Sequence, residues 1–234
     1  MIPSLADYAT FEDSAYPNLW GDCVIARYPG LIGAGARVPD FVNGDTNLIT
    51  SYVASRWEAE TGGYRYVQPE NTNNTILIAA PYIDFHLHAY CIWVRSTGQT
   101  ATRHVMSNGA AGVSVRIYIT TDGKINVSWA NGARILSSTT TDTTNVWRHV
   151  VVQRSRGNNV VQLWIDGVME ASSTLTTTVT TLEGPTTIGG RTDGGIVSTP
   201  FGGSWDDFRV YHRMLAPDEI KLLASQRGVS YIRR

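Results

Sequence analysis

The sequence predicts an all-β protein, a sandwich of two antiparallel sheets with one short helix near the C-terminus. Turn-forming residues recur about every ten residues along most of the chain, a spacing typical of sandwiches and barrels. The runs between them are rich in Val, Ile, Thr, Tyr and Trp, which favour strands. The 234 residues are 42% hydrophobic, which is enough to bury a sizeable core and excludes a disordered chain.

Residues 1–45 are predicted to form an irregular N-terminal arm. Prolines and a glycine-rich run at residues 30–35 interrupt this segment repeatedly, and both residue types break regular elements. We expect the arm to join a sandwich domain formed by residues 46–234. No linker marks a second domain.

Ten strands are expected in the rest of the chain, each rich in β-branched or aromatic residues and bounded by turn residues. They are residues 75–80, 86–96, 112–120, 124–130, 133–138, 147–155, 160–165, 168–174, 186–189 and 203–211. Asp-Gly pairs at residues 122–123 and 166–167 each lie between two of these strands. Because Asp-Gly adopts the positive φ values of a type I′ turn, both pairs predict tight hairpins.

The strand before the second Asp-Gly pair has two distinct faces. Val161, Leu163 and Ile165 alternate with Gln162 and Trp164, and successive side chains of a strand point to opposite faces. We expect the aliphatic face to enter the core. The opposite face is then free to present Trp164.

Residues 215–224 form the only segment with a convincing helix pattern. Pro217 falls in the first turn, where its missing N–H would have no helical partner. Asp218 and Glu219 follow and complement the positive end of the helix dipole. Gly228 marks the exit of the chain from this helix.

Charge and hydropathy exclude two classes of partner. The formal net charge of −1 offers no basic surface for nucleic acid. No stretch approaches the roughly 18 to 20 apolar residues of a membrane helix, so we expect no membrane insertion. The first residues lack the basic and apolar regions of a signal peptide, so no ordinary export signal is expected. Cys23 and Cys91 are expected to be buried, reduced thiols, although their spacing leaves open whether they pair.

Several segments in the second half resemble the landmarks of a known family. Residues 147–152 read Trp-Arg-His-Val-Val-Val, residues 161–168 read Val-Gln-Leu-Trp-Ile-Asp-Gly-Val, and residues 187–190 read Thr-Ile-Gly-Gly. Residues 205–215 read Trp-Asp-Asp-Phe-Arg-Val-Tyr-His-Arg-Met-Leu, shortly before Pro-Asp-Glu-Ile. In this order they resemble the laminin-G-like, concanavalin A-like jelly-roll family. Residues 88–95 also resemble an early strand of that family. The resemblance runs from about residue 75 to 225, and the first 70 residues depart from it.

The resemblance implies a concanavalin A-like jelly roll and, in addition, a metal. Members of the family often hold a structural Ca²⁺ on the convex side with an acid from the strand that matches residues 203–211. Asp206 and Asp207 are the implied ligands, and Ca²⁺ would need six to eight oxygens in all. The arm offers further carboxylates at Asp7, Glu12 and Asp13. The alternative is that the Asp206 carboxylate accepts hydrogen bonds from nearby backbone N–H groups. No cofactor other than calcium is expected.

Candidate catalytic and zinc residues are incomplete. Enzymes of the family carry acids in the form Glu-x-Asp-x-(x)-Glu, and a retaining glycosidase needs two carboxyl groups about 5 Å apart. Glu58 and Glu60 come nearest, but a glycine pair stands where the third acid belongs. His86 and His88 share a strand face as in a zinc site, yet zinc needs a third or fourth ligand. We therefore expect solvated carboxylates, half-buried histidines with hydrogen-bond partners, and no enzyme.

Loop residues offer a candidate glycan site. Planar Asn, Asp and Arg groups satisfy pairs of sugar hydroxyls, and an aromatic ring stacks on the apolar face of the sugar. The 7 Trp and 11 Tyr of the chain supply such rings. The candidate ligand-binding residues are Asn108, Asn131, Arg191 and Asp193. The alternative is that they only form turns, which use the same residue types.

Three functional hypotheses follow. The first is a non-catalytic phage protein on the virion surface, a capsid decoration or fibre-like subunit that adheres to proteins or glycans. A virion protein reaches the outside by assembly and lysis, so it needs no export signal, and its partners would be other virion proteins and like subunits in a homo-oligomer. The second is a carbohydrate-binding module, cellular or extracellular. The third, a glycoside hydrolase or lyase, ranks last because its acids are missing.

Overall fold

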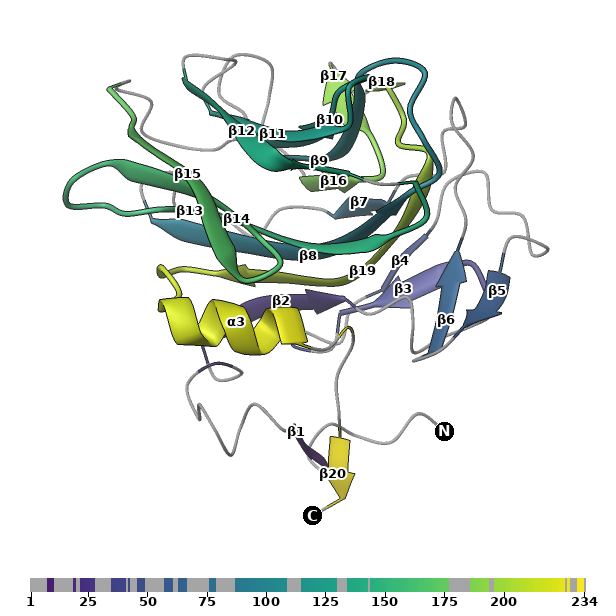
Figure 1. Ribbon diagram of the computed structural model, residues 1–234. Coiled ribbons are helices and arrows are strands. Elements are labelled where there is room, and N and C mark those ends of the chain that lie inside the picture. The colour runs from purple at the N-terminus through teal and green to yellow at the C-terminus, as the bar shows by residue number, and fades with distance from the viewer. Residues whose placement is uncertain are drawn as a thin grey trace.

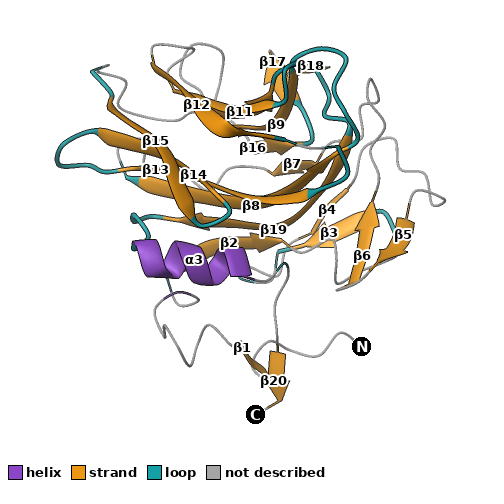
Figure 2. Cartoon of the chain, viewed as in Figure 1, coloured by secondary structure: helices purple, strands orange, loops and turns teal. Residues whose placement is uncertain are grey.

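Two six-stranded antiparallel sheets lie face to face in the computed structural model (Figure 1). The single labelled helix, α3 (Pro217–Ser225), covers one outer face (Figure 2). No helix in the described part of the chain is long and apolar enough to cross a membrane. The structure describes residues 8–10, 19, 22–27, 35–40, 42, 46–48, 57–60, 63–66, 76–78, 87–108, 115–129, 134–142, 144–176, 186–193, 196–225, 227 and 231–233.

We name the two sheets after a central strand of each. The β9 sheet contains, in spatial order, β12 (Arg134–Thr141), β11 (Lys124–Trp129), β10 (Val115–Ile119), β9 (Arg103–Asn108), β16 (Thr186–Ile188) and β7 (Ile76–Ile78). The β8 sheet contains β15 (Val168–Thr174), β14 (Val160–Ile165), β13 (Trp147–Arg154), β8 (His88–Ser96), β19 (Gly203–Tyr211) and β2 (Cys23–Arg27). These sheets confirm the predicted all-β sandwich.

Four two-stranded ribbons accompany the sandwich. They are β1 (Tyr8–Thr10) with β20 (Tyr231–Arg233), β3 (Arg37–Pro39) with β4 (Thr46–Leu48), β5 (Trp57–Glu60) with β6 (Gly63–Tyr66), and β17 (Arg191–Asp193) with β18 (Ile196–Ser198). Within the segment expected to be an arm, β2 is therefore a strand at the edge of the β8 sheet, paired with β19.

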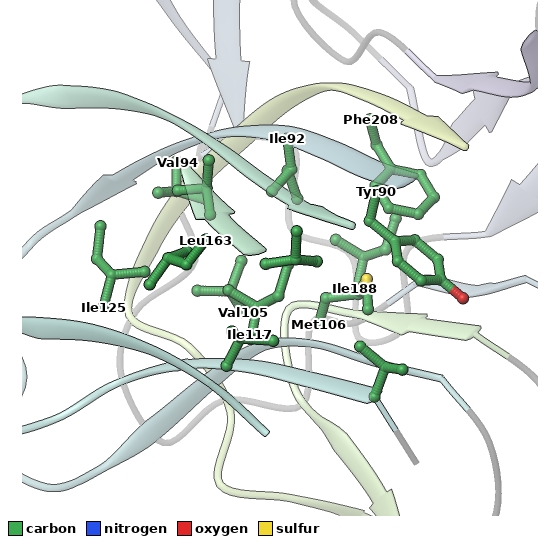
Figure 3. Packing of buried hydrophobic residues seen from close by; sticks show 14 of the residues in the cluster. Tyr90, Ile92, Val94, Val105, Met106, Ile117, Ile125, Leu163, Ile188 and Phe208 are labelled. Atoms are coloured by element: carbon green, nitrogen blue, oxygen red, sulfur yellow. The ribbon is translucent and has the colours of Figure 1, made fainter. Parts of the chain in front are cut away.

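The main core lies between the two sheets and follows the alternation of their strands. Tyr90, Ile92 and Val94 of β8 point toward Ile117 and Ile125 of the β9 sheet (Figure 3). All of these side chains are at most 1% exposed. Truncating one such aliphatic residue to alanine removes about 2 to 5 kcal/mol, so this layer supplies much of the stability.

All ten predicted strands overlap observed strands, but β9, at the centre of its sheet, was not predicted. Its register with β10 shifts between Ile117 and Tyr118, so Val105 is an extra residue in the ladder. Val105 and Met106 are consequently both buried in the core. A bulge of this kind breaks the strict alternation by which a strand is recognised in a sequence.

The two Asp-Gly hairpins differ. Asp166 and Gly167 have φ values of 50° and 81°, as a type I′ turn requires, which confirms the prediction for the second hairpin. In the first, Gly123 has a positive φ (75°) and Asp122 does not. The Gly123 N–H donates to the Thr120 carbonyl at 2.9 Å, which closes a three-residue loop with glycine at the left-handed position. The type I′ prediction for that loop was wrong because the loop is one residue longer.

A second core lies between the outer face of the β8 sheet and helix α3. Ile220 and Leu223 of the helix pack with Val151 and Trp164 of the sheet. Trp164 is only 8% exposed. The expectation that its strand face is free was wrong, because α3 covers that face.

Polar contacts fix the start of α3. Gln153 of β13 accepts a hydrogen bond from the Leu215 N–H at 2.9 Å. Glu219 accepts one from the Ala216 N–H at 2.8 Å, the reciprocal half of a capping box. Arg213 donates to both Glu219 carboxylate oxygens at 2.8 Å. The acids predicted for the first turn therefore cap the helix as well as complementing its dipole.

Both cysteines are free and buried, as expected. Cys23 lies on β2 and Cys91 on β8, with β19 between these strands. Two strand spacings amount to about 9.5 Å, beyond the roughly 7 Å of Cα separation that a disulfide spans. Burial also raises the pKa of Cys23 to about 12, so its thiol stays protonated.

Candidate functional site

The outer face of the β9 sheet, the face turned away from the core, is lined by polar side chains. On β10, Arg116 and Tyr118 alternate with core residues. Register places Tyr118 opposite His104 of β9 and Asn126 of β11. Further polar residues at outward positions of the same ladders are Ser107, Ser128, Ser137 and Thr187, while the exposed Ile135 lies opposite Ser128 at the edge of the sheet. We call this set the polar face.

His104, Tyr118 and Thr199 form one constellation on the polar face. The His104 and Tyr118 rings lie 5.3 Å apart between centroids and are tilted by 36°. His104 Nδ1 lies 2.7 Å from Thr199 Oγ1, and the His104 N–H donates to the Thr199 carbonyl at 3.0 Å. Contacts from both the backbone and the ring of His104 to Thr199 therefore fix the position of the imidazole.

Thr199 holds an unusual backbone conformation. Its φ is 46°, in the left-handed region that β-branched residues rarely adopt. Such backbone strain costs about 1 to 3 kcal/mol and is concentrated at functional sites. Here the strained residue directs its hydroxyl toward His104, which links the strain to the polar face.

Arg116 lies next to this constellation. Its side chain projects from the strand position two residues before Tyr118, and Arg116 is 8% exposed. Burial raises the pKa of the half-buried Tyr118, while the Arg116 guanidinium opposes this rise. The phenol is thus a neutral hydrogen-bonding group beside a permanent cation.

Asn126 extends the polar face along β11. Its amide nitrogen donates to Thr120 Oγ1 at 3.2 Å and to the Lys124 carbonyl at 3.1 Å. Its amide oxygen accepts from Ser137 Oγ of β12. These bonds fix the orientation of the amide, which is a condition for a preformed binding site.

The β17–β18 ribbon lies on the same side of the molecule as the polar face (Figure 1). Its base is closed by the Phe201 N–H, which donates to the Gly189 carbonyl at 2.9 Å. Gly189 has a φ of 88°, and Thr199 stands at the other end of the ribbon. A residue with left-handed backbone therefore flanks the ribbon on each side.

Comparison with known families identifies the fold. The family model described as the concanavalin A-like lectin/glucanases superfamily matches residues 61–221, more than half of the chain. The chain belongs to this superfamily. This confirms the resemblance found in the sequence, and the match begins earlier than that resemblance did. No curated protein matches the sequence.

Solved structures with a similar fold include a carbohydrate-binding domain, a toxin binding domain and a pentraxin. The CBM40 domain of the Ruminococcus gnavus IT-sialidase has a TM-score of 0.54 and 19% identity, over 68% of this chain and 96% of that chain. The binding domain of Paraclostridial Mosquitocidal Protein 1 has a TM-score of 0.68 and 14% identity, over 88% and 52%. A SAP-like pentraxin from Limulus polyphemus has a TM-score of 0.56 and 16% identity, over 72% and 90%.

The structure describes three of the four predicted ligand-binding residues. Asn108 ends β9 opposite the core residue Val115, is 2% exposed and donates to Thr186 Oγ1 at 2.5 Å. It therefore points into the sandwich and away from the polar face. Arg191 and Asp193 begin and end β17, near β9. Asn131 lies outside the described residues.

Sequence reasoning missed His104, Arg116 and Tyr118. The last two could have been found, because Arg116 and Tyr118 alternate with Val115, Ile117 and Ile119 in a strand that was predicted. His104 carried no such signal because its strand contains the bulge.

The predicted calcium ligands of this superfamily member are engaged by arginines. Arg227 Nη1 donates to Asp206 at 2.7 Å, and the Asp207 N–H donates to Asp206 at 2.9 Å. Arg209 binds both Asp207 oxygens, at 2.6 and 3.1 Å. Both acids are 2% exposed. In the part of the chain that is described, no group of three His, Cys, Asp or Glu residues could hold a metal. Calcium binding by Asp206 and Asp207 stays a prediction, and it would require these arginine contacts to be exchanged for the ion. The candidate partners Asp7, Glu12 and Asp13 lie outside that part.

The other candidate residues have structural contacts. Glu58 lies on β5, about half exposed, and pairs with Arg65 of β6 at 2.5 Å. His88 is fully buried and accepts a hydrogen bond from Trp129 Nε1 at 3.3 Å. His86 lies outside the described residues, as does the side chain of Glu60. The six strands of the β9 sheet contain no Asp or Glu, the residues that glycoside hydrolysis uses in pairs.

Proposed function

We propose that this chain is a non-catalytic carbohydrate-binding domain whose ligand contacts the polar face. The observation that carries the proposal is the His104–Tyr118–Arg116 constellation on a sheet without carboxylates. Hydroxyl, amide and guanidinium groups in fixed orientations satisfy sugar hydroxyls, and the half-buried Tyr118 ring offers an apolar surface for a sugar ring. The six strands of this sheet contain no Asp or Glu, so they do not supply the paired carboxylates that glycoside hydrolysis uses.

The structural neighbours support the same proposal. One of them is the R. gnavus CBM40 domain bound to α2,3-sialyllactose, with a TM-score of 0.51 and 19% identity. At 19% identity this similarity shows the shared fold alone. The groups proposed to contact the sugar are residues of this chain's own polar face and are not inferred from the neighbour.

The test is binding to a glycan array, followed by titration calorimetry with each hit. We expect Tyr118→Ala to weaken binding by at least about tenfold, since aromatic stacking and a hydrogen bond are lost together. Val146→Ala is the control, because Val146 is exposed just before β13 of the other sheet. Absence of binding to any glycan at millimolar protein would overturn the proposal.

We also propose that the domain is displayed on the surface of a phage virion and assembles with like subunits. The supporting observation is the edge strand β15, on which Val168 and Met169 are 62% and 47% exposed. Exposed apolar residues on an unpaired strand edge favour contact with another protein. Mass spectrometry of purified particles and light scattering of the isolated protein test this role. A monomer that is absent from particles would contradict it.

A further inference from the structure

Two irregular edge strands meet at one side of the sandwich. β12 and β15 are the outermost strands of their sheets, and they contact each other there (Figure 1). In β12, residues 138–140 lie opposite the single residue Ile125 of β11. In β15, Glu170 is the extra residue at which the register with β14 shifts between Leu163 and Trp164. Bulges of this kind re-aim side chains and backbone groups away from their own ladder.

The Glu170 carboxylate joins the two bulges. It accepts hydrogen bonds from the Thr139 N–H at 2.8 Å and the Thr140 N–H at 3.0 Å, and it also accepts one from the Thr140 hydroxyl. We call these three hydrogen bonds the clasp. Unpaired N–H groups at a sheet edge are the groups that an incoming strand binds. The clasp therefore occupies two backbone donors that another strand would need in order to pair with β12.

The β12 strand has a sequence that suits pairing with a copy of itself. Residues 135–141 read Ile-Leu-Ser-Ser-Thr-Thr-Thr, with no charge, proline or glycine and with four β-branched residues. Such runs favour strand association, and charges at their ends oppose it. Here the flanking charges are Arg134 and Asp142. Antiparallel pairing centred on Ser138 would place Arg134 of each copy opposite Asp142 of the other, so like charges would not be opposed.

Acid removes the negative charges at this edge. Part burial raises the pKa of Glu170, but the hydrogen bonds of the clasp outweigh it, so the pKa is lowered from 4.5. The clasp therefore contributes fully to stability above pH 4.5, and this contribution is lost as pH falls through the lowered pKa. Burial raises the pKa of Asp142 to about 6, so this acid is neutral before the clasp opens. β14 and β15 contain no other ionisable group, and Lys124 and Arg134 on the neighbouring strands stay charged in acid.

We propose that the clasp blocks the β12 edge at neutral pH and opens in acid, which lets β12 pair with β12 of a second copy. Two copies expose the same uncharged strand under the same condition, and antiparallel pairing of identical strands closes about a twofold axis. This association depends on neither glycan binding nor the contact proposed for β15, which needs no acid.

Hydrogen exchange at the Thr139 and Thr140 N–H groups tests the clasp itself. Glu170→Gln has the shape of the protonated acid, so at pH 7 both amides should exchange at least about tenfold faster than in the unaltered chain. Glu58→Gln is the matched control, because it removes a carboxylate that pairs with Arg65 in a separate ribbon. It should leave both amides unchanged. Equal exchange in the unaltered chain and in Glu170→Gln would overturn the proposal.

Analytical ultracentrifugation of the full chain tests the pairing with a second copy. The unaltered chain should gain mass between pH 7 and about pH 3, and Glu170→Gln should show the same gain already at pH 7. Ile135 is 50% exposed on β12, so Ile135→Lys adds an edge charge and should abolish the gain in both cases. Val146→Lys, the same kind of change away from this edge, should not.

The outcomes separate the parts of this proposal. A gain in mass that survives Ile135→Lys would overturn β12 as the interface. No gain in Glu170→Gln at pH 7 would overturn the second copy as the partner. A gain in Glu170→Gln without any in the unaltered, folded chain in acid would overturn the release by protonation.

Discussion

The outer faces of the two sheets use charge in opposite ways. On the β8 sheet, Asp207 and Arg209 are 2% and 1% exposed and bind each other beside helix α3. On the β9 sheet, Arg116 stands among hydroxyl side chains and an aromatic ring, with no carboxylate in any of the six strands. The comparison teaches that the outer face of the β8 sheet buries acids together with bases, whereas the strands of the β9 sheet bury hydroxyl, amide and ring groups on theirs, where we propose that a sugar binds.

The largest expected effect is the loss of the buried ion pair. Arg209→Gln leaves Asp207 as a buried charge, so we expect the free energy of unfolding to fall by about 3 to 5 kcal/mol. Arg116→Gln on the other sheet should cost less than about 1.5 kcal/mol. Urea denaturation measures both. Equal losses would show that Arg116 supports the fold as strongly as Arg209 and would break the comparison.

Two tryptophans on the β8 sheet test how much of its outer face the helix covers. Trp164 packs beneath α3, so Trp164→Ala should cost about 3 to 5 kcal/mol. Trp147 is half-buried and lies 4.4 Å from the Arg227 guanidinium, so Trp147→Ala should cost about 1 kcal/mol. Small and equal changes in the free energy of unfolding would contradict the covering role of α3.

Asp206 tests whether arginine or calcium completes the β8 face. Asp206→Ala removes the buried partner of Arg227, and we expect a loss of about 3 kcal/mol. If the arginine is the partner, the melting temperature falls equally in Ca²⁺ and in EDTA. A larger loss in Ca²⁺ than in EDTA would restore the calcium site predicted from the sequence.

Acid should destabilise the β8 face through His149. Burial, together with the charge of Arg209, lowers the pKa of His149 from 6.5 to about 3. Between these values the unfolded chain binds a proton that the folded chain does not, so this contribution is lost as pH falls below about 6.5. At pH 4.5 the loss is about 2 to 3 kcal/mol relative to neutral pH. His149→Gln should remove that slope from denaturation curves measured between pH 7 and about 4.5.

Asp142 gives an internal check on the sign of this pH effect. Burial raises the pKa of Asp142 from 3.8 to about 6, so the folded chain binds its proton first. Its contribution to stability therefore increases as pH falls from about 6 to about 4, opposite to that of His149. Asp142→Asn should steepen the loss of stability in acid. A flatter curve in that variant would contradict the raised pKa.

The smallest expected effect concerns the start of α3. Ala216 precedes the helix, and its N–H is bound by Glu219, but alanine offers no side-chain acceptor in return. Ala216→Ser would complete the capping box and should raise the free energy of unfolding by about 0.5 to 1 kcal/mol. Ala216→Val, which adds no acceptor and caps as poorly as alanine, is the control in the same urea titration. A serine variant no more stable than the valine variant would contradict this.

The sequence predicted the ten strands and the helix because alternation and turn residues are local signals. It did not predict that α3 covers Trp164, because the position of a helix over a sheet depends on the whole fold. The proximity of His104 to Thr199, 95 residues later, was equally invisible. Asn108 shows the same limit. Its amide is a group that can bind a sugar, but the register of β9 directs the side chain into the sandwich.

Thr199 has a consequence for how the polar face could be re-engineered. Glycine or asparagine would adopt its left-handed backbone more easily, but only a hydroxyl at this position reaches the imidazole. The backbone atoms of Thr199 therefore set the chain reversal, and its hydroxyl sets the orientation of the His104 ring. A substitution at this single position that relaxes the backbone therefore also releases the His104 ring.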